Sequence, residues 1–199
     1  MQRNSWGWIL ALAITAAVPA AAQDLGSDGD QFLRAVKEGD GARAMELAEM
    51  PGSTVVNYRG SDGNAALHIA MRAKNGNWVG YLLSKGADPN IADKNGDTPL
   101  ILAARLGYSE GAARLLMRSA QVDKSNKLGE TALIVAVQQR QPAIDRMLLQ
   151  AGANPDKADH AAGYSARDYA RRDTRSAELL RLIETLKPAK PAAVGPQVR

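Results

Sequence analysis

The sequence predicts an all-α solenoid of about five helix-turn-helix units, which are joined by short β-hairpin loops. The first observation is a 33-residue period, because Gly96, Leu100 and Ala103 each have a counterpart 33 residues earlier and another 33 residues later. A period between about 20 and 50 residues is typical of stacked structural repeats. The second observation is that the clearest copies contain a turn signal followed by two short apolar segments with helical spacing. The third is a hydrophobic content of 45%, which is ordinary for a folded globular chain.

Residues 1–22 are predicted to be a secretory signal peptide. Arg3 supplies a positive charge, residues 8–18 form a short apolar segment, and three alanines at 20–22 form a small-residue cleavage site. A membrane-spanning helix needs about 20 apolar residues, so this length disfavours the alternative of an uncleaved membrane anchor. We therefore expect cleavage after the last of these alanines and a periplasmic protein, with secretion from the cell as the alternative. Residues 23–29 are expected to be a short linker.

The first unit, residues 30–60, is expected to be an atypical end repeat. Its segment DQFLRAVKEGD aligns Phe32 with Leu100, and Ala35 with Ala103. The segment MELAEMPGSTVVN that follows matches a second helix and its loop only in part. The end units of a solenoid face water on one side, so departures from the repeat are expected there.

The second unit, residues 61–93, contains GNAALHIAM for its first helix, a Leu-Leu pair for its second helix, and GADPN for its closing turn. Lys74 stands where the third unit has a helix-ending glycine, Gly107. A side chain that is forced into the left-handed backbone region costs about 1 kcal/mol. The sequence therefore predicts a less stable turn at Lys74, unless Asn75 and Gly76 provide another turn.

The third unit, residues 94–126, carries the clearest signals. Asn95 and Gly96 predict a tight turn, Thr98 is a suitable N-cap, and Pro99 suits the first helical turn because it lacks an N–H. The residues predicted to end the first helix, to cap the second helix and to face inward from it are Gly107, Ser109, Ala112, Leu115 and Leu116. This unit therefore predicts the sequence helix, turn, helix, hairpin loop.

The fourth and fifth units are residues 127–160 and 161–187. The fourth unit has GETALIVAV, a Leu-Leu pair and GANPD, with Arg140 at the helix-ending position. The fifth unit has GYSARDYARR, in which Ala170 takes the inward-facing alanine position and polar neighbours mark an end unit. Residues 188–199 are rich in proline and alanine and are expected to be a disordered tail.

These motifs resemble the ankyrin repeat, whose pattern is G-x-T-P-L-H-x-A-A, followed by L-L and then by G-A-D-x-N. The pattern is matched in pieces at 63–90, 96–116 and 129–156, and weaker copies extend the resemblance over residues 30–187. The resemblance implies a solenoid in which His68 hydrogen-bonds backbone groups between units, although no unit has the complete T-P-L-H motif. The residues expected to build the structure are Leu67, His68, Ala70, Leu82, Leu83, Thr98, Pro99, Leu100, Ala103, Leu115, Leu116, Leu133, Ala136, Leu148 and Leu149.

The residue types that catalysis needs are scarce. Cysteine is absent, which excludes disulfides, thiolate metal sites and a cysteine nucleophile. With only two histidines, the chain has little material for a Ser-His-Asp set. His160 lies near Asp156 and Asp159 in the sequence, but a metal site needs three or four converging ligands. We therefore expect no catalytic residues, no cofactor and no metal, with a metal-dependent hydrolase near His160 as the rival interpretation.

In ankyrin repeat proteins, partners usually dock on the tips of the hairpin loops and on the exposed face of the first helix. The partner-binding residues that the resemblance implies are Arg72, Lys94, Asn95, Asp97, Arg105, Leu106, Lys127, Leu128, Gln138, Gln139, Tyr164 and Arg171. Four of these residues are spaced by 33 positions and would form a row along a regular stack: Arg72, Arg105, Gln138 and Arg171. The row predicts a partner protein with an acidic segment, and a solvated charged face is the alternative.

The predicted function is that of a protein–protein interaction module in the bacterial envelope, which acts as a scaffold, a stabiliser or an inhibitor. An exported effector that binds a host protein and an immunity protein against an envelope toxin are the alternatives. A formal charge of +4 is too mild to indicate nucleic-acid binding, and no membrane insertion is expected after signal cleavage. The mature chain is expected to be a monomer. Trp78 is expected to pack within the array rather than to recognise a partner.

Overall fold

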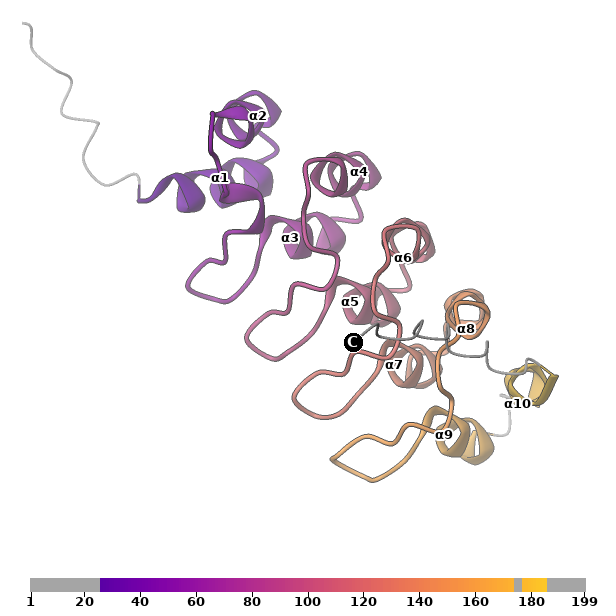
Figure 1. Ribbon diagram of the computed structural model, residues 1–199. Helices are drawn as coiled ribbons and strands as arrows, with labels where there is room; N and C mark the ends of the chain where they lie inside the picture. The colour runs from indigo at the N-terminus through magenta and orange to yellow at the C-terminus, as the bar shows by residue number, and fades with distance from the viewer. Residues whose placement is uncertain (1–25, 174–176, 186–199) are drawn as a thin grey trace, which may run out of the picture.

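The computed structural model is a row of helical pairs stacked side by side (Figure 1). It describes residues 26–173 and 177–185. Within these ranges the regular structure is helical and no strand is present, which confirms the predicted all-α solenoid. No helix in the described ranges is long and apolar enough to cross a membrane. The predicted signal peptide at 1–22 and the predicted tail at 188–199 lie outside the described residues.

Each unit contributes two helices, of which the first lies in one layer and the second in another (Figure 1). The first helices are α1 (Asp28–Glu38), α3 (Ala66–Arg72), α5 (Pro99–Leu106), α7 (Ala132–Gln138) and α9 (Ala166–Arg172). The second helices are α2 (Gly41–Glu49), α4 (Gly76–Ser84), α6 (Ser109–Leu116), α8 (Pro142–Gln150) and α10 (Ala177–Thr185). A 3₁₀ helix, η2 (Val55–Asn57), follows α2.

Helix α1 begins earlier than the sequence analysis expected. The Ser27 hydroxyl accepts a hydrogen bond from the Asp30 amide at 3.2 Å, and the Asp30 carboxylate accepts one from the Ser27 amide at 3.2 Å. This reciprocal pair satisfies two amides that a helix end otherwise leaves unpaired. The helix therefore starts at Asp28, inside the segment 23–29 that was expected to be a linker.

The third unit begins as its capping residue predicts. Thr98 caps α5, because its hydroxyl accepts a hydrogen bond from the Ile101 amide at 3.2 Å. The predicted cap at Ser109 is wrong, since Ser109 is the first residue of α6 and Tyr108 holds the N-cap position without a side-chain hydrogen bond. The Tyr108 side chain is buried in the core instead, so packing rather than capping determines where α6 starts.

Alanines allow the first helices of adjoining units to pack closely. Ala70, Ala103 and Ala136 occupy equivalent positions in consecutive units, and each is at most 1% exposed. They belong to one hydrophobic core that contains residues of every unit. Every residue that was predicted to be structural is buried except Leu116, which is half-buried at the C-terminal end of α6. Each unit therefore depends on its neighbours to cover its apolar surface.

Two turns between paired helices have a strained backbone. Lys74 and Arg140 have φ angles of 49° and 55°, close to the 65° of Gly107 at the equivalent position. Asn75 does not provide another turn, because its side chain caps α4 by accepting a hydrogen bond from the Trp78 amide at 3.1 Å. Each non-glycine residue in this conformation costs about 1 kcal/mol, as the sequence analysis predicted.

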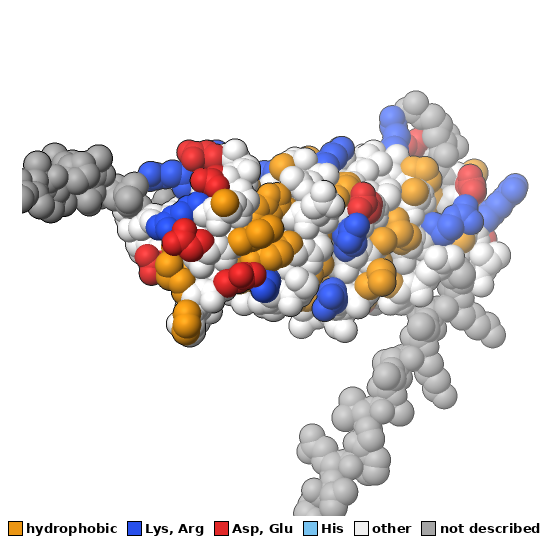
Figure 2. All heavy atoms as spheres, turned by 90° about the horizontal axis from the view of Figure 1, so that it is seen from above, with side chains coloured by type: hydrophobic (Ala, Val, Ile, Leu, Met, Phe, Trp, Pro, Cys, Tyr) orange, Lys and Arg blue, Asp and Glu red, His pale blue; other side chains and the backbone are white. Residues whose placement is uncertain are grey.

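The second helices form the outer face that is seen in Figure 2. Acidic and basic side chains are interspersed with hydrophobic ones there, and neither charge predominates (Figure 2). The exposed pair of Glu49 with Lys85, at 2.8 Å, is one example, and such surface pairs contribute little to stability. Trp78 is half-buried on α4 and meets the Tyr81 ring edge to face with centroids 5.4 Å apart, as its predicted packing role requires.

The loops between units project on the side away from the second helices, and we call them fingers (Figure 1). The fingers comprise residues 59–65, 92–98, 125–131 and 158–165. Each folds back as a hairpin: in one of them the Asp93 amide donates to the Asp97 carbonyl at 3.0 Å. Consecutive fingers are also joined, because the Lys127 amide donates to the Asn95 carbonyl at 3.0 Å. The fingers therefore form a continuous ledge along the first helices.

Candidate protein-binding groove

A groove of about 760 Å³ lies between helix α5 and the fingers 92–98 and 125–131. Its lining consists of Arg72, Asp93, Asn95, Asp97, Leu102, Arg105, Leu106, Asn126, Lys127, Leu128 and Glu130. The structure thus brings together seven of the residues that were predicted to bind a partner: Arg72, Asn95, Asp97, Arg105, Leu106, Lys127 and Leu128. The predicted residues outside this lining are Lys94, Gln138, Gln139, Tyr164 and Arg171.

Three leucines give the groove an apolar strip. Leu102 and Leu106 come from α5, where Leu102 is 5% exposed and Leu106 is half-buried. Leu128 comes from the tip of the finger 125–131, and its side chain is 55% exposed. A large apolar side chain that is left open to water beside others is a feature of interaction surfaces.

A hydrogen-bonded network joins the fingers beneath this strip. Asp97 is only 8% exposed, and both of its carboxylate oxygens accept from the Arg105 guanidinium, at 3.0 and 3.1 Å. Asn126 donates its amide to Asp97 and to Glu130, each at 2.8 Å. Asp97 was predicted to contact a partner, but its burial means that it positions Arg105 and Asn126 instead.

The row of arginines is compensated by carboxylates of the same chain. Arg72 lies 3.6 Å from the buried Asp93 carboxylate, Arg105 is held in the network above, and Arg171 lies 3.7 Å from Asp168. The row is therefore not the uncompensated basic stripe that its spacing suggested. The lining of the groove carries three cationic and three acidic side chains, so its formal charges cancel.

Three residues that were not predicted shape the fingers, and the 33-residue register contains the signal for them. Asp93, Asn126 and Asp159 occupy equivalent positions, and each accepts hydrogen bonds from two backbone amides of its own finger. A short polar side chain that binds its own backbone in this way stabilises a turn. These three residues therefore fix the shape of the surface that a partner would meet.

The comparison with protein families agrees with this architecture. A family model described as ankyrin repeats, in three copies, matches residues 67–159. These residues are ankyrin repeats. The 2-5A-dependent ribonuclease of Mus musculus is a similar protein, 36% identical over 80 residues, and the match covers 36% of this chain. The chain spans about 10% of the length of that relative. Ankyrin repeats serve as protein–protein interaction modules, so the groove is the natural place to seek a binding site.

His68 has the position in the ankyrin array that the family resemblance implied. Its ring is fully buried, Nδ1 accepts a hydrogen bond from the Ala65 amide at 3.1 Å, and Nε2 donates to the Asp97 carbonyl at 3.1 Å. Burial lowers the pKa of the His68 imidazole, so the ring stays neutral at neutral pH. His68 thus caps α3, where Ala65 offers no side-chain oxygen, and ties it to the next finger.

The surroundings of His160 do not gather into a metal site. His160 is exposed on the last finger, and its amide donates to the Leu128 carbonyl at 2.8 Å. Asp156 is bound to Arg167 at 2.6 Å and Asp159 accepts from the Tyr169 hydroxyl at 2.6 Å. No group of three histidine or carboxylate ligands is present in the described part of the ankyrin array or its flanks.

The remaining predicted contacts lie on the third, fourth and fifth units, where Lys94 is exposed on the finger 92–98. Gln138 and Gln139 are exposed at the end of α7. Tyr164 is half-buried on the last finger, with the Arg172 guanidinium 4.6 Å from its ring centroid and the Tyr169 ring edge to face at 5.6 Å. Tyr164 is therefore engaged within the array, while the two glutamines extend the exposed surface beyond the groove.

Proposed function

We propose that the groove binds a segment of another protein, and that it does so in the bacterial envelope as a scaffold, a stabiliser or an inhibitor. The observation that carries this proposal is the exposure of Leu128, which is 55% exposed at the rim of the groove. Leu106 lies half-buried in the same lining. An apolar side chain of a partner would remove both leucines from water, and full burial of one leucine contributes about 1.5–3 kcal/mol.

The partner segment is proposed to carry acidic residues on either side of its apolar anchor. The groove arginines already pair with carboxylates, but Lys94 and Lys127 are exposed and form no ion pair within the described part of the chain. They stand at the tips of adjoining fingers, so their ammonium groups are available to an acidic partner. Such rim charges accelerate association more than they strengthen the final complex.

Leu128→Asp is expected to reduce capture of the partner at least about tenfold, because it places a charge where an apolar anchor is buried. The measurement is affinity capture from an envelope extract with quantitative mass spectrometry, followed by titration of the recovered partner. Met117→Asp is the matched control, since Met117 is 84% exposed but lies outside the groove lining. Equal losses of partner capture in the two variants, or no loss in Leu128→Asp, would argue against the groove as the binding site.

Capture of the partner should also weaken at high salt, since salt screens the charges of Lys94 and Lys127.

The envelope location rests on the predicted signal peptide at 1–22. We expect cell fractionation to recover the chain in the periplasm, and N-terminal sequencing to begin at residue 23. Recovery of the mature chain from the medium would favour an exported effector, and retention of an uncut chain in the cytoplasm would contradict both.

A further inference from the structure

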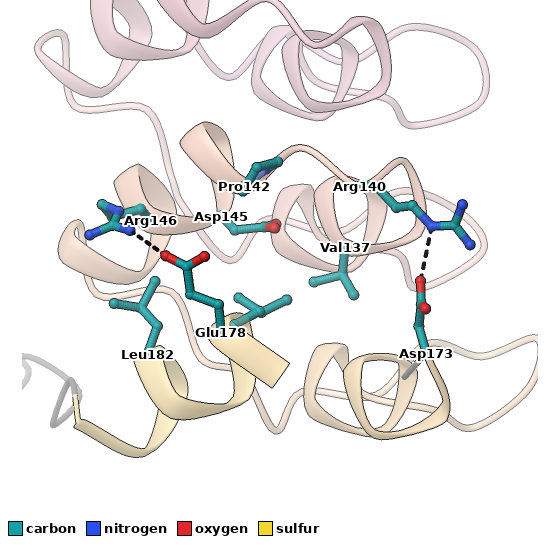
Figure 3. Close-up of a pocket in the computed structure, with 9 residues that line it drawn as sticks. Val137, Arg140, Pro142, Asp145, Arg146, Asp173, Glu178 and Leu182 are labelled. Atoms are coloured by element: carbon teal, nitrogen blue, oxygen red, sulfur yellow. Dashed lines mark hydrogen bonds and ion pairs between the residues drawn. The ribbon is translucent and has the colours of Figure 1, made fainter. Parts of the chain in front are cut away.

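A second hollow, well away from the groove, lies near the C-terminal end of the array. Its volume is about 300 Å³, and it is bounded by α7, α8 and α10 and by the end of α9 (Figure 3). Its apolar lining consists of Val137, Pro142, Leu179 and Leu182. Two ion pairs border it: Arg140 with Asp173 at 2.9 Å, and Arg146 with Glu178 at 3.1 Å. We call this hollow the end cavity.

Asp145 on α8 lies in the end cavity between these two ion pairs (Figure 3). Its side chain is 3% exposed, and its Oδ1 atom has no hydrogen-bond partner among the described residues. The residues 33 and 66 positions earlier are Ala112 and Val79, and both are fully buried. A carboxylate thus stands where the repeat has an apolar side chain. When such a buried carboxylate is ionised without a partner it is strongly destabilising, and a cation bound beside it would offset that cost.

We propose that the end cavity binds a primary aliphatic amine, whose ammonium group pairs with Asp145 while its carbon chain contacts the apolar lining. With Asp145 ionised, the described lining carries three carboxylates and two guanidinium groups, and the guanidinium groups pair with Asp173 and Glu178 rather than with Asp145. Arg140 and Arg146 are already bound to carboxylates, so neither is free to hold an anion. A divalent metal ion requires several converging oxygens, and no such group is found in the described ranges.

The size of the end cavity limits the carbon chain. Its volume of about 300 Å³ lies at the lower end of the range for small-molecule pockets, which suits a chain of about four to six carbons. A lysine side chain carries the same group on the same length of chain. The amine can therefore come from a small molecule or from a lysine of another protein, and the two sources need separate probes.

The test is a titration of the full chain with n-butylamine at pH 8, followed by amide NMR shifts. We expect saturable shifts on α8 and α10, and an affinity at least about tenfold weaker for n-butanol, which lacks the charge. Asp145→Asn should weaken butylamine binding by at least about tenfold, while Glu110→Gln, an exposed carboxylate on α6, should leave it unchanged. Leu182→Phe should weaken the binding of both n-butylamine and n-butanol, because it fills the cavity while it leaves the Asp145 carboxylate in place.

A second readout separates binding at Asp145 from binding elsewhere. Burial raises the pKa of the Asp145 carboxyl to about 7, and a bound ammonium group should lower it again, as followed by the carboxyl ¹³C shift. Nα-acetyl-lysine amide is the probe for a protein source: binding of this probe alone, lost in Asp145→Asn, would support the proposal with lysine as the source. Equal affinities for butylamine and butanol, unchanged affinity in Asp145→Asn, or binding of neither amine would overturn it.

Discussion

Gly63→Ala is expected to destabilise the array by about 3 kcal/mol, because the new methyl group meets the backbone of the next finger. Gly63 has a φ angle of 78°, which costs an alanine about 1 kcal/mol by itself. A Cβ atom at this position would also lie 2.6 Å from the Lys94 amide nitrogen and 3.2 Å from its Cα. Backbone atoms cannot rotate away, so adjoining fingers must separate, and overpacking of this kind costs about 1–3 kcal/mol more.

Gly86→Ala isolates the conformational part of this effect. Gly86 has a φ angle of 85°, but a Cβ atom there would meet no atom within 4 Å. We therefore expect Gly86→Ala to lower the free energy of unfolding by about 1 kcal/mol. For both variants it is measured by urea unfolding, followed by far-ultraviolet circular dichroism. Hydrogen exchange should show faster opening of the fingers 59–65 and 92–98 in Gly63→Ala alone. Equal losses in the two variants would contradict the close approach of neighbouring fingers.

The features that the sequence predicted correctly are those that a few neighbouring residues determine. The cap at Thr98 and the left-handed turn at Gly107 depend on contacts within about four residues; the cap recurs at Thr131, and the turn recurs at Lys74 and Arg140. The repetition of the unit then predicts that the units pack side by side, because a unit of this size cannot cover its own apolar faces. Ser109 shows the limit of this reasoning, since burial of the preceding Tyr108 outweighs the preference of serine for the N-cap.

The features that were not predicted arise between units. Arg105 and Asp97 are eight positions apart in the same unit, but Asn126 reaches Asp97 from the next finger, 29 positions later, so the complete network exists only once the fingers are stacked. Spacing alone placed the arginines in a row, but it could not reveal which carboxylates lie beside them. The sequence therefore predicted a basic stripe, whereas the structure has an apolar strip with balanced charges. Leu128 is the residue of this strip on which the proposed binding depends most.

Asp145 is different, because the repeat itself contains the signal for its burial. The 33-residue register aligns it with Ala112 and Val79, which predicts burial.

Asp145→Ala is expected to stabilise the array by about 2 kcal/mol at pH 8, and to have little effect at pH 4. Burial raises the pKa of the Asp145 carboxyl from 3.8 to about 7, so the folded protein binds this proton more tightly than the unfolded chain.

The direction of the pH dependence follows from that difference. The difference in the free energy of unfolding, wild type minus Asp145→Ala, should fall as the pH rises from about 4 to about 7, and should not fall further above that range. The full shift of the Asp145 pKa corresponds to about 4 kcal/mol of unfolding free energy. Relaxation of the ionised side chain toward water roughly halves the stabilisation that is expected for Asp145→Ala. Taking the difference removes the contribution of the other titrating groups, which both proteins share, and alanine has no proton to lose.

Two controls separate ionisation from packing. Asp145→Asn keeps the shape and cannot ionise, so it should also remove the fall in stability between pH 4 and pH 7, but with a smaller gain because its amide stays unpaired. Glu38→Gln, which changes an exposed carboxylate at the end of α1, should keep the wild-type pH dependence. The measurement is urea unfolding at several pH values without added amine. A wild-type stability that changes with pH over this range in the same way as that of Asp145→Ala would mean that the folded protein ionises Asp145 as readily as the unfolded chain does, which its burial without a partner does not allow.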